Sequence, residues 1–187
     1  VTMEAFCEGK LNEAVLAGKK DLPKKDWVSP EVADNEGFQV VLDPLGRLAY
    51  HRPFLQRGTG PRQHIIEVVS EKVSGAYLSY LREVGVSYIV AGEDSLKGSV
   101  ILQKLADLFG ISRIALSGGL TNGTFLREGL IDELSLVIVP VAEMEKGATS
   151  FEAMDGAPLL KNPAFILKGV EVLAKDALWI RYERVNG

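Results

Sequence analysis

The residues best placed to do chemistry lie between positions 115 and 124, in the segment ALSGGLTNGT. An apolar run ends at Ser117, two glycines follow, and a helical pattern begins near residues 122–124. Glycine lets a ligand approach bare backbone, because no Cβ intervenes. A helix N-terminus adds unpaired N–H groups and the positive end of a dipole. The combination predicts a phosphate or pyrophosphate site. A tight strand–helix turn that needs glycine for geometry alone explains the segment equally well.

Two common nucleotide-binding motifs do not occur in the sequence. Without G-x-x-x-x-G-K-[ST], a Walker-type nucleotide triphosphatase is disfavoured. Without G-x-G-x-x-G, an ordinary Rossmann dehydrogenase is disfavoured as well.

A serine hydrolase is the rival from another chemistry. Ser117 stands between an apolar run and a helical pattern, which resembles a nucleophile elbow. In that fold the acid and the histidine follow the serine along the chain. Both histidines, His51 and His64, precede Ser117. The order therefore argues against a catalytic triad.

The remaining polar residues suggest no second centre. The histidines and Cys7 lack the paired spacing of a metal site, so no metal is expected. His64 opens an apolar run, and we interpret it as structural. The acidic pair at 132–133 has the chemistry for acid–base work. It begins a strand rather than ending one as Ser117 does, so a turn or interface role is favoured.

The elements that must position these residues follow from apolar periodicity. Strands are predicted over 38–43, 64–70, 87–92, 113–117 and 132–140, and helices over 4–16, 74–84, 95–109 and 125–128. Gly85 and Gly110 end two of the helices. The alternation predicts parallel crossover units. Two final runs around the turn Lys175-Asp176 predict an antiparallel hairpin. The expected fold is α/β, with a mixed, mostly parallel sheet flanked by helices.

Composition limits the class of protein. The chain has 187 residues, a net charge of −4 and one cysteine. We expect a single domain over residues 1–187, with no nucleic-acid or membrane-surface role. No run of about 18 apolar residues and no signal peptide appear, and a lone cysteine fits the cytoplasm.

Residues 87–140 carry a resemblance to a known family. The segments GVSYIVAGEDS, LADLFGISRIALSGGLTNGTFLREGLIDELSLVIVP and LAKDALWIRYERV are similar to the C-terminal reductase domain of riboflavin biosynthesis, a relative of dihydrofolate reductase. Weaker similarity extends back through FQVVLDPLGRL, so that about four-fifths of the chain is covered. The order of Gly-Gly, Asn-Gly, FLREGLIDELSL and Pro is specific to the family.

The resemblance implies a dihydrofolate-reductase-like sheet that binds NADPH and reduces a phosphoribosylamino-pyrimidine by hydride transfer. Cofactor contacts near the glycine-rich turn would come from Gly118, Gly119, Thr121, Asn122, Gly123 and Thr124. Gly92 would line the adenosine side. Thr2 would take the place of a cofactor-binding threonine that follows a glycine motif in the family. The family also forms dimers, and the apolar strand LIDELSLVIVP fits an expected homodimer.

Two departures from the family pattern leave alternatives open. Ser117 stands where the family usually has a glutamate that reaches the substrate, and it would be a substrate-binding residue here. The family opens with a strand that carries a Ser-Leu-Asp-Gly type motif, which is not found in this sequence. In one alignment that strand would precede Val1 and is missing; in the other, residues 1–11 take its place, with Glu8-Gly9 for Asp-Gly. No catalytic residue is assigned. The alternative function is a non-catalytic or weakly active member that keeps a nucleotide cleft or a dimer surface.

Overall fold

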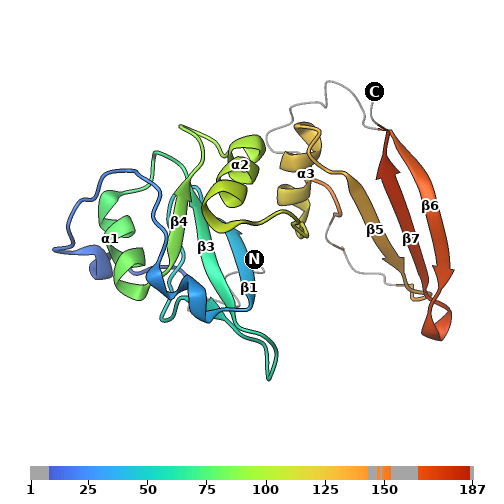
Figure 1. Ribbon diagram of the computed structural model, residues 1–187, viewed down its shortest axis with the longest axis horizontal. Coiled ribbons are helices and arrows are strands. Elements are labelled where there is room, and N and C mark those ends of the chain that lie inside the picture. The colour runs from blue at the N-terminus through green and yellow to red at the C-terminus, as the bar shows by residue number, and fades with distance from the viewer. Residues whose placement is uncertain (1–8, 143–146, 148, 153–163, 186–187) are drawn as a thin grey trace. The chain divides into compact units, whose positions relative to one another are not determined.

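The computed structural model describes residues 9–142, 147, 149–152 and 164–185 (Figure 1). The chain divides into two compact units, Val1–Arg113 and Ile114–Gly187. The single-domain interpretation of residues 1–187 stays a prediction. Within the described ranges, none of the helices has the length and apolar character needed to cross a bilayer.

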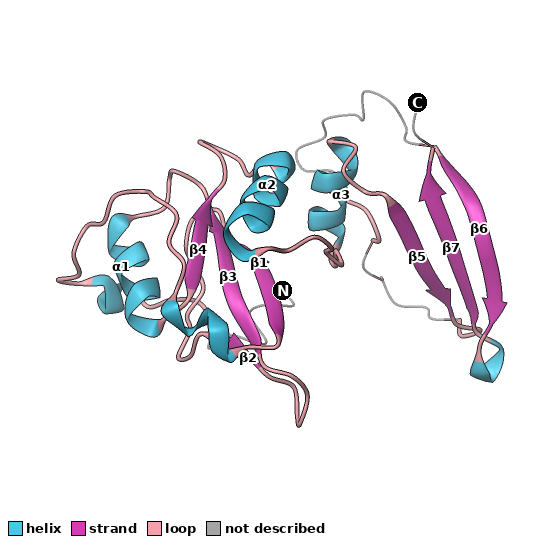
Figure 2. Cartoon of the chain, viewed as in Figure 1, coloured by secondary structure: helices cyan, strands magenta, loops and turns pink. Residues whose placement is uncertain are grey.

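The first unit is built on a four-stranded mixed sheet (Figure 2). Strand β3 (Gln63–Val69) pairs in parallel with β1 (Gly37–Leu42) and with β4 (Ser87–Val90), and β2 (Phe54–Leu55) pairs with it antiparallel. Six of the seven β3 residues are buried, as expected for a parallel strand covered on both faces. The predicted strands at 38–43, 64–70 and 87–92 are confirmed.

Two helices of the first unit follow their capping residues. Helix α1 (Gly75–Val84) starts after Ser74, whose hydroxyl accepts the Tyr77 N–H, and it ends at Gly85 with φ 87°. Helix α2 (Gly98–Phe109) ends at Gly110 with φ 66°. It begins three residues later than predicted, because the chain after β4 first folds back and the Lys97 N–H bonds to the Ala91 carbonyl at 2.9 Å.

The core of the first unit lies where α1 packs on the sheet. Its side chains come from one face of each element, so they are spaced two residues apart on the strands and three or four apart on the helix. Fully buried members include Val41, Val69, Tyr77, Leu78, Leu81, Val86 and Tyr88.

Two elements predicted from local pattern are wrong. Only Glu13–Leu16 of the predicted helix 4–16 is helical among its described residues, as a 3-10 turn. Gly9 has φ 85° and Lys10 bridges to Leu48, so these residues before the turn are not helical. Residues 113–117 form no ladder within the described chain. An alternating pattern predicts a strand, but the strand also needs a partner to bond.

The second unit contains α3 (Gly119–Arg127) and an antiparallel sheet. Strand β7 (Leu178–Arg184) lies between β5 (Glu133–Ile138) and β6 (Phe165–Val172). The closing hairpin is confirmed, and its turn places Lys175 and Asp176 at φ 61° and 59°. Strand β5 was expected in the parallel series and instead pairs antiparallel with β7. Parallel pairing in the described chain is thus confined to the first unit.

Candidate functional site

The glycine-rich turn leads into α3, which begins earlier than its pattern suggests. Gly118 is the N-cap, with φ 100° and ψ 132°, a conformation that side-chain-bearing residues rarely adopt. The helix then starts at Gly119, and the Asn122 N–H already bonds to the Gly118 carbonyl at 2.9 Å. The first-turn N–H groups that lack a partner within the helix therefore belong to residues 119–121. The predicted start near residues 122–124 is wrong by about one turn.

Several glycines of this segment meet the chain's own backbone. A Cβ on Gly123 would lie 1.9 Å from the Glu152 carbonyl oxygen, and one on Gly119 would lie 2.7 Å from that of Thr149. The Glu152 N–H donates to the Gly119 carbonyl, and the Asn122 amide donates to the Ser150 carbonyl, both at 2.9 Å. Close packing against residues 149–152 is therefore enough to explain why positions 119 and 123 are glycine, without a ligand.

Gly118 and Thr121 differ from those two glycines. Among the described residues, and apart from its chain neighbours, the atom nearest to a Cβ built on Gly118 is Thr121 Oγ1, at 4.0 Å. Ser117 and Gly118 are exposed, and Thr121 is half-buried. Thr124 points the other way: it is buried, and its hydroxyl donates to the Leu120 carbonyl at 2.9 Å. The open side of the turn is therefore formed by residues 117–121.

Gly92 lies in the first unit, where the chain leaves β4. Its φ is 136°, and a Cβ there would lie 2.0 Å from the Ser95 carbonyl oxygen. The Glu71 N–H bonds to the Gly92 carbonyl at 2.9 Å, which joins the loops that follow β3 and β4. Both loops are at the carboxyl ends of parallel strands, where open α/β sheets bind their ligands. Thr2 lies outside the described residues.

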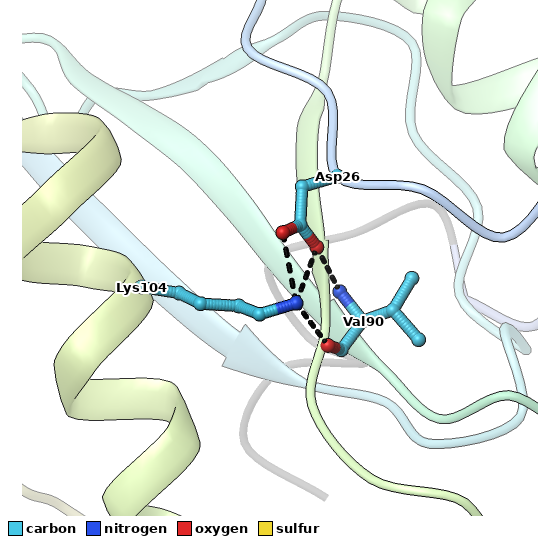
Figure 3. A network of polar contacts seen from close by, with 3 residues as sticks. All are labelled: Asp26, Val90 and Lys104. Atoms are coloured by element: carbon cyan, nitrogen blue, oxygen red, sulfur yellow. Dashed lines mark hydrogen bonds and ion pairs between the residues drawn. The ribbon is translucent and has the colours of Figure 1, made fainter.

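An ion pair braces the end of β4 beside Gly92 (Figure 3). The Lys104 ammonium on α2 lies 2.8 Å from Asp26 Oδ2 and 2.7 Å from the Val90 carbonyl oxygen. Asp26 Oδ1 accepts the Val90 N–H at 2.8 Å. Both backbone groups of Val90 are thus bound by side chains instead of by another strand. Nothing in the sequence points to this pair, because its members are 78 residues apart.

His64 is structural, as the sequence suggested. Its ring is buried, and Nε2 lies 2.8 Å from Ser87 Oγ, which also accepts the Ser29 N–H. Burial lowers the pKa of His64 from 6.5 to about 4, because the charged imidazolium is poorly solvated there. The ring is therefore neutral at physiological pH, and it contacts the Ser87 hydroxyl that ties Ser29 to β4.

The match to a known family covers most of the chain. The model of the RibD C-terminal domain matches residues 10–178. The chain belongs to this family. Its family is that of the reductase domain of riboflavin biosynthesis, and the resemblance inferred from the sequence is confirmed. No curated protein matches the chain significantly.

Solved structures show the same fold at low identity. A pyrimidine reductase-like protein from Corynebacterium diphtheriae is 18% identical, with a TM-score of 0.62 over 80% of this chain and 62% of that one. RibD from Acinetobacter baumannii is 20% identical, with a TM-score of 0.51 over 78% of this chain and 37% of that one. This RibD-family chain therefore has the dihydrofolate-reductase-like α/β fold, and it spans under two thirds of the length of either relative.

Proposed function

We propose that this chain binds NADPH and acts as a reductase on a small phosphoribosylamino-pyrimidine-like substrate. The observation that carries the proposal is the start of α3. Three first-turn N–H groups follow Gly118, where a Cβ would meet no described atom closer than Thr121 Oγ1 at 4.0 Å apart from its chain neighbours. Such a turn suits the pyrophosphate of a dinucleotide. Membership in the RibD reductase family supports the choice of cofactor and reaction class.

Only the residues on the open side of the turn into α3 are placed to contact the phosphates of the cofactor. Gly118, Gly119 and Thr121 would hold the pyrophosphate through backbone N–H groups and the Thr121 hydroxyl, and Asn122 and Thr124 would support the turn. Gly123 would contribute by letting residues 149–152 pack close, and the role of Gly92 at the adenosine side stays a prediction from the resemblance. NADPH would supply the hydride. Ser117 would offer a hydrogen bond to a substrate hydroxyl, without the charge of a carboxylate.

The experiment places a negative charge beside the proposed phosphate site. We expect Thr121→Glu to lower the affinity for NADPH at least tenfold, since a carboxylate would compete with the phosphates for the first-turn N–H groups. An acidic residue in a first turn favours the helix, so folding should be preserved. Arg127→Gln makes the same charge change at the other end of α3 and serves as the control. Equal affinities of both variants and the parent chain in calorimetry would reject the site.

Ser117 favours a second candidate function. A member that binds the nucleotide without efficient turnover would show normal NADPH affinity and no oxidation of NADPH with the pathway intermediate. The family's glutamate is replaced in this chain by an exposed serine. If Ser117→Glu creates turnover, the serine accounts for the missing activity. If the parent chain turns over and Ser117→Glu lowers the rate, the serine serves a different substrate.

A homodimer is the assembly we propose. The register of the second sheet places nine apolar side chains on one face: Leu134, Leu136, Ile138, Leu167, Val170, Val172, Leu178, Ile180 and Tyr182. Ile138, Leu167, Val170 and Val172 are all more than half exposed. Soluble proteins seldom leave an apolar patch of this kind to water. A second copy would bury on the order of 1,200 Å² or more in total.

The dimer is tested by a charge on that face. Val170→Glu should give the monomer mass in light scattering at micromolar concentration, while the parent chain gives twice that mass. Glu171→Gln alters the opposite face of the same strand and should leave the dimer intact. A monomeric parent chain would count against the proposal.

A further inference from the structure

A carboxyl group is buried in the middle of the first sheet. Glu67 lies on β3, between Val41 of β1 and Tyr88 of β4 in the register, and its side chain has no exposure to solvent. A carboxylate loses its hydration in such a place, so it persists only if it is paired or protonated. Neither the sheet nor the proposed cofactor site requires an acidic residue here.

The contacts of Tyr77 show whether the Glu67 carboxyl is ionised or protonated. The Tyr77 hydroxyl lies 2.7 Å from Glu67 Oε1 and 2.8 Å from the Leu48 carbonyl oxygen. A tyrosine hydroxyl has one hydrogen to donate, and a carbonyl oxygen can only accept. If the hydrogen bonds to Leu48, the hydrogen between Glu67 and Tyr77 must come from Glu67. An ionised Glu67 would leave one of these two short contacts without a hydrogen.

We infer that Glu67 keeps a proton in the native protein and begins a hydrogen-bond chain, from Glu67 to Tyr77 to the Leu48 carbonyl, that fixes the connection between β1 and β2. The chain gives every member a donor or an acceptor. It makes Glu67 a positioning residue for the Leu48 carbonyl, to which it is linked through Tyr77. The inference is independent of the proposed function.

The groups that face Glu67 favour this protonation state. Asp43, at the end of β1, accepts the N–H groups of Arg47 at 2.5 Å and Leu48 at 2.9 Å. Burial, and then the Asp43 charge, raise the pKa of Glu67 well above its usual range, and hydrogen bonding with Tyr77 and Tyr50 lowers it by less. From β4, the Tyr88 hydroxyl accepts the Arg82 Nε–H instead.

The connection held in this way runs from residue 43 to residue 50. Leu48 is bound at both backbone groups, by Asp43 and by Tyr77. Tyr50 is also bound at both, by the Tyr80 hydroxyl at 2.5 and 2.6 Å. A proton on Glu67 therefore completes a set of side-chain bonds from the sheet and α1 to the segment that leaves the carboxyl end of β1.

The test is the pH dependence of folding. Above the usual glutamate pKa of 4.5 the unfolded chain releases this proton and the native chain keeps it, so stability falls as pH rises. Glu67→Gln keeps the shape and cannot ionise. From roughly pH 6 to 8, the folding equilibrium constant of the parent chain should fall by about tenfold per pH unit relative to the variant. A ratio that does not change with pH would overturn the inference.

Two further measurements keep the result unambiguous. Tyr80→Phe removes the α1 hydroxyl that binds Tyr50 of the same connection and keeps Glu67, so it should show the parent slope. Carbon-13 NMR of the glutamate carboxyls needs no variant: one resonance should stay protonated through pH 7. If all glutamates of the parent chain titrate in the ordinary range, Glu67 is ionised and the inference is wrong.

Discussion

The two units fix their candidate ligand-binding segments by different means. In the first unit, side chains do so: Asp26 and Lys104 brace the end of β4, and Asp43 holds the segment after β1. In the second unit the backbone does so, because Gly119 and Gly123 let residues 149–152 lie directly on α3. Side chains that hold a segment through ion pairs or hydrogen bonds can shift slightly when a neighbour changes. Backbone packed directly on a glycine has no flexible atom that can move away.

The difference predicts that the second unit is the less tolerant of a single methyl group. Gly123→Ala would place a Cβ 1.9 Å from the Glu152 carbonyl oxygen. We expect a loss of about 3 kcal/mol in the free energy of unfolding, at the upper end for overpacking. Chemical denaturation with fluorescence detection measures it. Gly169→Ala on β6 is the control, because its Cβ would meet only Arg181 at 3.5 Å, and it should change stability by under about 0.5 kcal/mol. Equal effects of the two variants would remove the distinction.

Removing the Lys104–Asp26 ion pair of the first unit should lower the free energy of unfolding by less than Gly123→Ala does. Lys104→Met leaves the Asp26 carboxylate and the Val90 carbonyl short of a donor in a site that is about 70% buried. We expect about 1–3 kcal/mol of destabilisation. Lys72→Met breaks an ion pair with Asp94 in which both side chains are mostly exposed. It should lower the free energy of unfolding by about 0–1 kcal/mol. If Lys104→Met behaves like Lys72→Met in the same unfolding experiment, Asp26 finds another partner.

The same difference explains what the sequence could reveal. Glycine runs and periodic apolar residues are visible in one dimension, so the turn at 118–124, helices α1 and α2 and the closing hairpin were predictable. The pairing of Asp26 with Lys104, and of Glu67 with Tyr77, depends on tertiary contacts that no spacing encodes. The strand predicted at 113–117 and the parallel placement of β5 were wrong for a related reason: periodicity identifies an extended segment but not its partner.

The start of α3 was the hardest feature to place from its residues. Leu120 and Thr121 have no helical signature beside two glycines, so the pattern pointed to residues 122–124. The unusual backbone of Gly118 lets the helix begin at once. This shift by one turn decides which N–H groups would face a phosphate in the proposed site.

The central claim is that NADPH binds at those first-turn N–H groups. The most direct test follows the backbone amide resonances of the nitrogen-15-labelled chain during a titration with NADPH. We predict saturable shifts for Gly119, Leu120 and Thr121 that are larger than those of residues 125–127 on the same helix. Saturable binding that leaves residues 119–121 unmoved, or no binding at all, would contradict the claim.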